Sequence, residues 1–140
     1  MDSKKEILSR IPQRPPFLYI QDILDRTENS VLTAMNFDEK LDFFQGHFPQ
    51  QPLVPGVLLC EMAFQSGALL MSYLDNLPAD QTAVVTRIQN AKFKRMVRPN
   101  DRVECQVHLK ELIAPACFMK AKLTVNQQTC LQLDFSCATT

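Results

Sequence analysis

The sequence predicts an α+β fold in which an antiparallel sheet packs against one apolar helix. Residues 57–73 form a nearly continuous apolar segment, long enough for a helix of about 25 Å at about 1.5 Å per residue. From residue 83 onward, apolar and polar residues alternate, as they do along strands with one buried face. Short turn-like segments separate the alternating stretches, which favours antiparallel neighbours.

Length and composition indicate a single globular domain spanning residues 1–140. Hydrophobic residues make up 46% and charged residues 21%, and 15 basic side chains balance 15 acidic ones. No global field therefore favours nucleic acid as a partner. The first ten residues, MDSKKEILSR, lack the apolar core of a signal peptide, so we expect a cytoplasmic protein. Polar residues interrupt the longest apolar stretch, which argues against a membrane span.

The chain has five cysteines, an odd number without any C-x-x-C spacing. Most fall at apolar positions of periodic segments, so we expect buried free thiols. Only two histidines are present, and no H-E-x-x-H motif or phosphate-binding glycine motif occurs. We therefore expect neither a metal nor a cofactor. The cysteines are Cys60, Cys105, Cys117, Cys130 and Cys137.

The N-terminal third is expected to form a short helix, an extended segment and a strand. Ser3 and Glu6 match an S-x-x-E capping box, which predicts a helix over residues 4–10. Three prolines between Pro12 and Phe17 predict an extended connection. Residues 31–37 then alternate like a strand.

The middle of the chain combines an ordered loop with the apolar helix. All three glycines and three prolines fall between residues 46 and 67, so residues 46–56 should follow a defined path. The helix over residues 57–73 has almost no solvated face and should be buried. One small sheet cannot cover such a helix on every side, which favours a dimer.

The C-terminal half is expected to form strands that include residues 103–109, 117–125 and 131–137. Turns are predicted at residues 99–101, 114–116 and 126–128. His108 lies at a polar position of one of these strands and should be solvated.

Three features could carry chemistry. Glu61, Gln65 and Ser72 lie on one line of the apolar helix, where burial would raise the pKa of Glu61 and make it a proton donor. A Glu61 paired with a buried arginine, or facing water, is the alternative. His47 lies in the glycine-rich loop as a candidate base or a plain surface residue. The N–H of Gly56, at the helix start, could bind a carbonyl oxygen, or Gly56 could serve only as a tight entry.

The segment GHFPQQPLVPGVLLCEMAFQ, from Gly46 to Gln65, closely resembles the signature of bacterial 3-hydroxyacyl-acyl-carrier-protein dehydratases. Two further segments, RPPFLYIQDIL and AKFKRMVRPNDRV, resemble other parts of that family. The resemblance implies a hotdog fold, a curved antiparallel sheet wrapped around one long central apolar helix. It also implies homodimers, which often assemble into trimers of dimers, and active sites shared between subunits.

The resemblance assigns roles residue by residue. His47 would be the base, and Glu61 from the other subunit would protonate or orient the departing 3-hydroxyl. The N–H of Gly56 would bind the thioester oxygen, the carbonyl of Leu53 would orient the His47 ring, and Gln65 would hold the carboxyl of Glu61. The product would be a trans-2-enoyl thioester made from the (3R)-hydroxyacyl form, as in fatty acid or related acyl-chain biosynthesis.

Departures from the family pattern bear on specificity. A glutamate at position 61 is typical of the branch that dehydrates without isomerising. Gln50 stands where many relatives have glycine, Gln13 replaces a frequent histidine, and Phe64 replaces a small alanine. Bulk at Phe64 would reshape the acyl tunnel.

The implied partner is an acidic acyl carrier protein. Four basic residues are candidates for its docking rim, although an exposed strand face would show the same charges: Lys92, Lys94, Arg95 and Arg98. Two alternatives remain, a hotdog acyl-thioester hydrolase and a catalytically weak acyl-carrier-binding partner.

Overall fold

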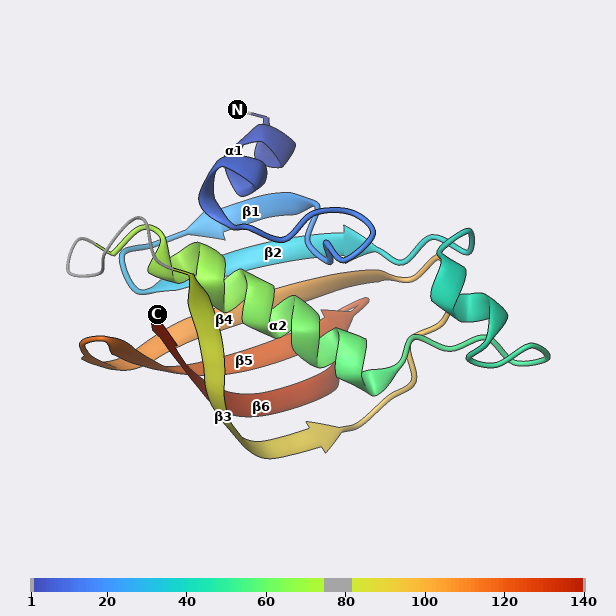
Figure 1. Ribbon diagram of the computed structural model, residues 1–140. Helices are drawn as coiled ribbons and strands as arrows, with labels where there is room; N and C mark the ends of the chain where they lie inside the picture. The colour runs from blue at the N-terminus through green and yellow to red at the C-terminus, as the bar shows by residue number, and fades with distance from the viewer. Residues whose placement is uncertain (1, 75–81, 140) are drawn as a thin grey trace.

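A six-stranded antiparallel sheet curves around the main helix in the computed structural model, which describes residues 2–74 and 82–139. Helix α2 runs along the concave face of the sheet (Figure 1). The strands follow the order β1-β2-β4-β5-β6-β3. The elements are α1 (Ser3–Arg10), β1 (Asp22–Arg26), β2 (Ser30–Asn36), the short helix η1 (Asp42–Gln45), α2 (Gly56–Met71), β3 (Ala83–Phe93), β4 (Arg102–Ile113), β5 (Ala116–Val125) and β6 (Gln128–Thr139).

The sheet confirms the predicted hairpins joining β4, β5 and β6, but one predicted neighbour is wrong. The turn at residues 99–101 does not join adjacent strands, because β3 pairs with β6 at the far edge, where Ile88 lies opposite Phe135. Residues 94–101 connect the two distant strands. At this pairing, Ser136 of β6 is buried and its hydroxyl shares a 2.8 Å hydrogen bond with Thr86 of β3. Strand β1 was not predicted.

Helix α2 begins one residue before the predicted start and ends two residues before the predicted end. It contacts β2, β3, β4, β5 and β6. Met62, Leu69 and Leu70 are fully buried, and each such side chain stabilises the fold by about 1.5–3 kcal/mol. The one polar pair in this contact is satisfied, because Ser66 donates to the carbonyl of Met62 and shares a 2.8 Å hydrogen bond with Thr33.

The N-terminal helix is capped differently from the prediction. Asp2 is the N-cap, and its carboxylate accepts the N–H of Lys4 at 3.0 Å. Ser3 lies inside the helix, and its hydroxyl accepts the N–H of Ile23 at 3.1 Å instead. Aspartate is at least as good a cap as serine, so the helix starts one residue earlier than the capping box suggests.

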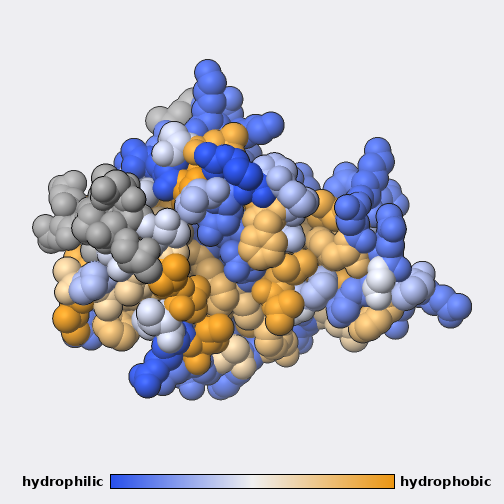
Figure 2. Space-filling view, viewed as in Figure 1, coloured by the Kyte–Doolittle hydropathy of each residue, from blue (hydrophilic) through white to orange (hydrophobic). Residues whose placement is uncertain are grey.

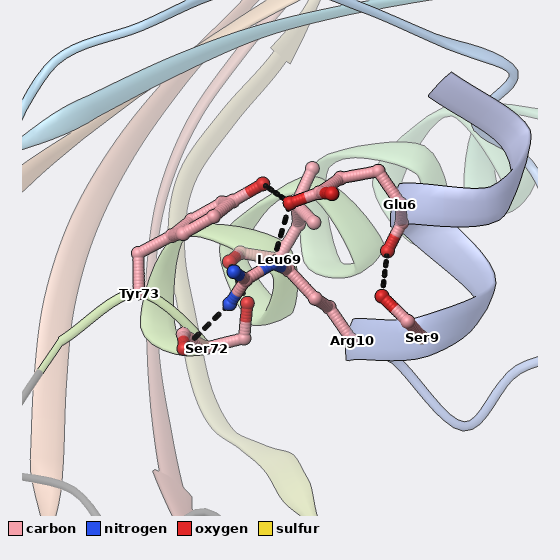
Figure 3. A network of polar contacts seen from close by, with 6 residues as sticks. All are labelled: Glu6, Ser9, Arg10, Leu69, Ser72 and Tyr73. Carbon is pink, nitrogen blue, oxygen red and sulfur yellow. Dashed lines mark hydrogen bonds and ion pairs between the residues drawn. The ribbon is translucent and has the colours of Figure 1, made fainter. Parts of the chain in front are cut away.

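A polar cluster, called here the α1 clamp, holds α1 against the C-terminal end of α2 (Figure 3). Arg10 bonds to Glu6 at 2.7 Å and to the carbonyl of Ser72 at 3.2 Å. The hydroxyl of Tyr73 donates to Glu6 at 2.9 Å. Arg10 and Arg26 each lie 3.9 Å from the centre of the Tyr73 ring, a favourable cation–π distance.

The five cysteines are all buried and unpaired, as predicted. Burial raises the pKa of both Cys105 and Cys137 to about 12, which keeps their thiols protonated. Within the described residues, no helix is long and apolar enough to cross a membrane. Nor does that part of the chain place three or more His, Cys, Asp or Glu side chains together as metal ligands.

Candidate active site

The loop that carries His47 is closed by its own backbone. The N–H of Leu53 donates to the carbonyl of His47 at 2.9 Å, and Phe48 and Gln51 exchange two backbone hydrogen bonds at 3.1 and 3.0 Å. The N–H of Val54 then donates to the carbonyl of Val97 at 2.8 Å. These bonds fix the loop to itself and to the segment after β3, so His47 rests on an ordered support.

The hydrogen bond of the His47 ring defines which nitrogen is basic. Its Nδ1 lies 3.1 Å from the carbonyl oxygen of Leu53. A carbonyl oxygen only accepts, so Nδ1 carries the hydrogen, and Nε2 of the neutral ring has a free lone pair. The ring is half-buried and stacks on Phe48 with centroids 4.0 Å apart. In this tautomer, Nε2 can accept a proton from a substrate.

Glu61 projects from α2 without a charged partner. Its Oε2 accepts a hydrogen bond from Nε2 of Gln65 at 3.0 Å. Burial raises the pKa of Glu61, and the Gln65 hydrogen bond partly opposes that rise. Among the residues that the structure describes, no lysine, arginine or histidine forms an ion pair with Glu61. The alternative of a buried arginine partner is therefore not what the structure shows.

Gln65 joins Glu61 to the proline-rich segment, a contact that sequence reasoning missed. Gln65 is fully buried, its Oε1 accepts the N–H of Tyr19 at 2.8 Å, and its Nε2 also donates to the carbonyl of Phe17 at 2.9 Å. Backbone atoms make these contacts, so no side-chain pattern could reveal them. The sequence indicated only that Pro15 and Pro16 keep this segment extended, which leaves its backbone groups free to bond to another element.

Gly56 is the first residue of α2, and the aromatic ring of Phe93 occupies the space beside it. A Cβ at this position would lie 2.7 Å from a ring carbon of Phe93 in β3. Glycine therefore lets the half-exposed Phe93 ring rest against the start of α2, in addition to the close substrate approach expected from the sequence. The N–H of Gly56 remains at the positive end of α2.

Phe64 packs edge-on against Phe135, with ring centroids 5.2 Å apart. Gly67 permits this pair, because a Cβ on Gly67 would lie 2.8 Å from the Phe135 ring. Phe64 remains partly exposed on the same helix as Glu61. The two rings therefore hold the middle of α2 against β6.

One chain does not bring the two predicted catalytic residues into contact. No hydrogen bond or ion pair links His47 to Glu61 within residues 2–74 and 82–139. A mostly apolar pocket of about 800 Å³ was also not predicted, and neither residue lines it. It lies between α1, the proline-rich segment and residues 40–43.

The four predicted docking residues are all exposed. Lys92 lies at the end of β3, and Lys94, Arg95 and Arg98 lie in the connection to β4. Val97, in the same connection, bonds to Val54 of the His47 loop. These four side chains, called here the basic rim, therefore belong to a segment attached to the candidate site.

His108 is exposed on β4, as predicted.

The chain is similar in sequence to known dehydratases. Residues 24–132 match the family model described as ApeI-like, ApeI dehydratase. A FabZ 3-hydroxyacyl-acyl-carrier-protein dehydratase from Variovorax paradoxus is 35% identical over 95% of this chain and 91% of the relative. The FabZ enzyme of Shewanella woodyi is 41% identical over 75% of this chain and 70% of the relative.

Solved structures show the same fold at low sequence identity. The dehydratase heterocomplex ApeI:P from Xenorhabdus doucetiae matches with a TM-score of 0.81 and 11% identity, covering 96% of this chain and 90% of that one. A mutant thioesterase from Pseudomonas aeruginosa matches with a TM-score of 0.73 and 18% identity, covering 99% and 94%. These likenesses and the curved antiparallel sheet establish an α+β hotdog fold. The sequence relatives and the family-model match show that the chain belongs to the FabZ-like family of 3-hydroxyacyl-acyl-carrier-protein dehydratases.

Proposed function

We propose that this protein removes water from (3R)-hydroxyacyl-acyl carrier protein to give the trans-2-enoyl thioester in fatty acid or related acyl-chain biosynthesis. The observation that carries the proposal is that the chain holds two groups suited to proton transfer, which the proposed dimer would bring together. His47 presents a free Nε2 lone pair on an ordered loop, and Glu61 has a pKa raised by burial. A base with a free lone pair and an acid whose pKa is raised suit an elimination that needs one proton taken and one given.

In the proposed reaction, Nε2 of His47 takes a proton from C2, next to the thioester carbonyl. The electron pair of that C–H bond forms the C2–C3 double bond, while the N–H of Gly56 stabilises negative charge on the carbonyl oxygen. The C3–O bond breaks, and Glu61 protonates the departing oxygen to form water. His47 then holds one extra proton and Glu61 lacks one, so transfer between them restores the starting forms.

The surface supports a homodimer as the working unit. Hydrophobic side chains gather on the face that carries α2 and β3 (Figure 2). Strand β3 is an edge strand and is exposed along nearly its whole length, with Val84, Val85, Ile88 and Phe93 among its exposed residues. Such an edge is a template for pairing with another chain. We propose that two copies join here and that each His47 meets the Glu61 of its partner.

In that dimer, α2 takes the central position of the hotdog fold. The acyl chain would lie between subunits beside Glu61, with the partly exposed Phe64 shaping the tunnel. A trimer of dimers is the larger assembly that we propose, and a complex with a related but different subunit is the competing assembly. The proposed partner for catalysis is an acidic, cytoplasmic acyl carrier protein that docks on the basic rim.

The direct test is an assay of purified protein with 3-hydroxyacyl and 2-enoyl thioesters of acyl carrier protein over a series of chain lengths. We expect interconversion of the two thioesters. His47→Ala and Glu61→Gln should each lower the rate by about 10²–10⁴-fold, the usual contribution of a general acid or base, while leaving the assembly intact. Release of free carrier thiol would instead indicate a hydrolase. Inactivity at every chain length, in the presence of intact dimer, would favour the acyl-carrier-binding alternative.

A further inference from the structure

The Gln65 side chain has no freedom in its orientation. It is fully buried, and the two backbone groups that face it have opposite hydrogen-bonding roles. The N–H of Tyr19 can only donate, and the carbonyl of Phe17 can only accept. Rotating the amide by half a turn would place donor against donor and acceptor against acceptor. The backbone therefore assigns the oxygen and the nitrogen of Gln65 without ambiguity.

This assignment leaves one hydrogen of Gln65 for Glu61. Nε2 has two hydrogens, of which one goes to Phe17 and the other to Oε2 of Glu61. An amide nitrogen cannot accept a hydrogen bond. Oε2 therefore accepts this hydrogen bond whether the carboxyl is ionised or protonated. The hydroxyl oxygen of a protonated carboxyl can also accept, but the carbonyl oxygen is the stronger acceptor, so the bond from Gln65 favours Oε2 as the carbonyl oxygen and Oε1 as the hydroxyl oxygen.

We propose that the backbone of residues 17–19, acting through Gln65, favours Oε1 over Oε2 as the oxygen that carries the acidic proton of Glu61. Gln65 is then a positioning residue, and the segment from Phe17 to Tyr19 is a structural part of the acid even though none of its side chains is catalytic. The inference rests on the proposed function only for its catalytic meaning, because the proton placement is a property of the free protein.

The placement has a consequence for the elimination. The bond from Oε1 to its hydrogen breaks, the proton joins the departing 3-hydroxyl oxygen to make water, and the electron pair stays on the carboxylate. As negative charge develops, the hydrogen bond from Gln65 to Oε2 becomes charge-assisted and therefore stronger. Gln65 thus stabilises the transition state more than the resting acid, which is the requirement for raising kcat.

The titratable neighbours of Glu61 are uncharged in the part of the chain that the structure describes. There, the groups that interact electrostatically with Glu61 are Tyr19, Cys60 and Cys137, and burial raises the pKa of each one. All three are therefore uncharged near neutral pH.

Neutron diffraction tests the placement directly. Crystals of the wild-type protein exchanged into D₂O at a pH below the pKa of Glu61 should show deuterium on Oε1, with both deuterons of the Gln65 amide directed at Phe17 and Oε2. Deuterium on Oε2, or an amide rotated by half a turn, would overturn the inference. This measurement needs neither substrate nor a variant.

The catalytic consequence is tested with Gln65→Met, which keeps the side-chain length and removes the amide. Because the Gln65 hydrogen bond lowers the pKa of Glu61, its loss should raise that pKa. The carboxyl ¹³C titration of Glu61, identified by its loss in Glu61→Gln, should move to higher pH. The alkaline limb of the kcat profile should move with it, and kcat should fall about tenfold or more.

Ser66→Ala is the matched control. Ser66 is equally buried on α2, but its hydroxyl contacts Thr33 and the carbonyl of Met62, away from Glu61. Ser66→Ala should lower stability and leave the Glu61 titration in place. A Gln65→Met titration no different from that of Ser66→Ala would reject the positioning role. A wild-type protein with no dehydratase activity would reject the proposed function and leave the neutron and NMR results to decide the proton placement.

Discussion

At the scale of single residues, the most informative side chain is Glu61, a half-buried carboxyl with one neutral hydrogen-bond partner. Structural carboxylates are normally matched by a cation when water is removed, because an unmatched charge is costly. Here Gln65 is the only side chain that bonds to Glu61 within the described residues. Glu61 therefore lowers the stability of the folded protein relative to a neutral residue at this position. A residue that is kept despite such a cost is typical of a functional site.

The loss of stability caused by burying the Glu61 carboxylate should appear in the pH dependence of the free energy of unfolding. Burial raises its folded pKa above 4.5, so the unfolded chain releases the proton at lower pH than the folded chain does. Stability is therefore lost as pH rises from the unfolded value through the folded value, and it stays lower above that window. Glu61→Gln cannot ionise and should escape this loss.

Thermal unfolding of both proteins between about pH 4 and about pH 8 measures this effect. The Tm of Glu61→Gln minus that of the wild type should increase with pH and then level off, although the variant is inactive. A difference that is constant or decreases with pH would contradict the burial argument.

The sequence was sufficient to nominate most residues of the candidate site, since motif spacing placed His47, Glu61 and Gln65. The contact between the His47 ring and the carbonyl of Leu53 came from the family resemblance, and the structure contains it. Two contacts could not be predicted. Phe17 and Tyr19 reach Gln65 through backbone atoms, and Phe93 meets Gly56 from a distant strand. Local residue patterns do not indicate these contacts, because the partners are distant in sequence or bond through backbone atoms.

At the scale of elements, α1 depends on the α1 clamp for its position. Arg10 makes three of the clamp's contacts, with Glu6, Ser72 and the ring of Tyr73. Arg10 and Tyr73 lower the pKa of Glu6, so the clamp should persist until the pH falls through that lowered value. The helix itself is only 8 residues long and would be marginal alone.

Arg10→Ala should therefore release α1 without unfolding the sheet. Loss of the cation–π contact alone, about 0.5–1 kcal/mol at an exposed site, corresponds to about 2–5-fold faster amide exchange. Hydrogen–deuterium exchange should show at least this increase for residues 3–10 and little change in β4–β6. Lys5→Ala, at an exposed position of the same helix, is the control. Equal protection in both variants would show that the clamp is energetically unimportant.

The basic rim makes a separate prediction about substrate binding. If an acidic carrier docks there, Arg95→Glu combined with Arg98→Glu should raise KM for acyl-carrier substrates about tenfold or more and leave kcat nearly unchanged. Turnover of a small thioester analogue without the carrier should be unaffected. Lys120→Glu, an exposed charge reversal on β5, supplies the control. An equal effect of both changes would indicate only long-range electrostatics.

The element scale also shows where sequence reasoning failed. Alternation and turns predicted β4, β5 and β6, because each hairpin is local. The pairing of β3 with β6 joins residues about fifty positions apart, and a turn at residues 99–101 cannot indicate which strand lies next to β3. β1 was missed because its 5 residues, DILDR, are mostly charged and exposed.

At the scale of the whole molecule, the two edge strands of the sheet differ in what they offer a partner. Both carry an exposed aliphatic side chain, Leu24 on β1 and Ile88 on β3, which are 44% and 49% exposed. Only β3 continues into the apolar face beside α2. Ile88→Arg should therefore give an inactive monomer in analytical ultracentrifugation, whereas Leu24→Arg should remain an active dimer. Dimer loss in Leu24→Arg instead would place the interface on the opposite edge.

An active site shared between subunits can be tested more directly than dimer formation. Two inactive variants should recover dehydratase activity when their subunits are combined in one dimer. In a mixed dimer of His47→Ala and Glu61→Gln, one site has lost both groups and the other retains an intact His47 from one subunit and an intact Glu61 from its partner. Random co-refolding makes about half of the dimers mixed, so activity should return to about a quarter of the wild-type value under two-fold symmetry.

If each chain instead supplied its own acid and base, every site in the mixture would carry one defect, and activity would stay at the level of the separate variants. Mixing the folded dimers without co-refolding gives the matched control, since their subunits have not been exchanged. Recovery that depends on subunit exchange is therefore expected only if His47 and Glu61 act across the interface that β3 and α2 are proposed to form.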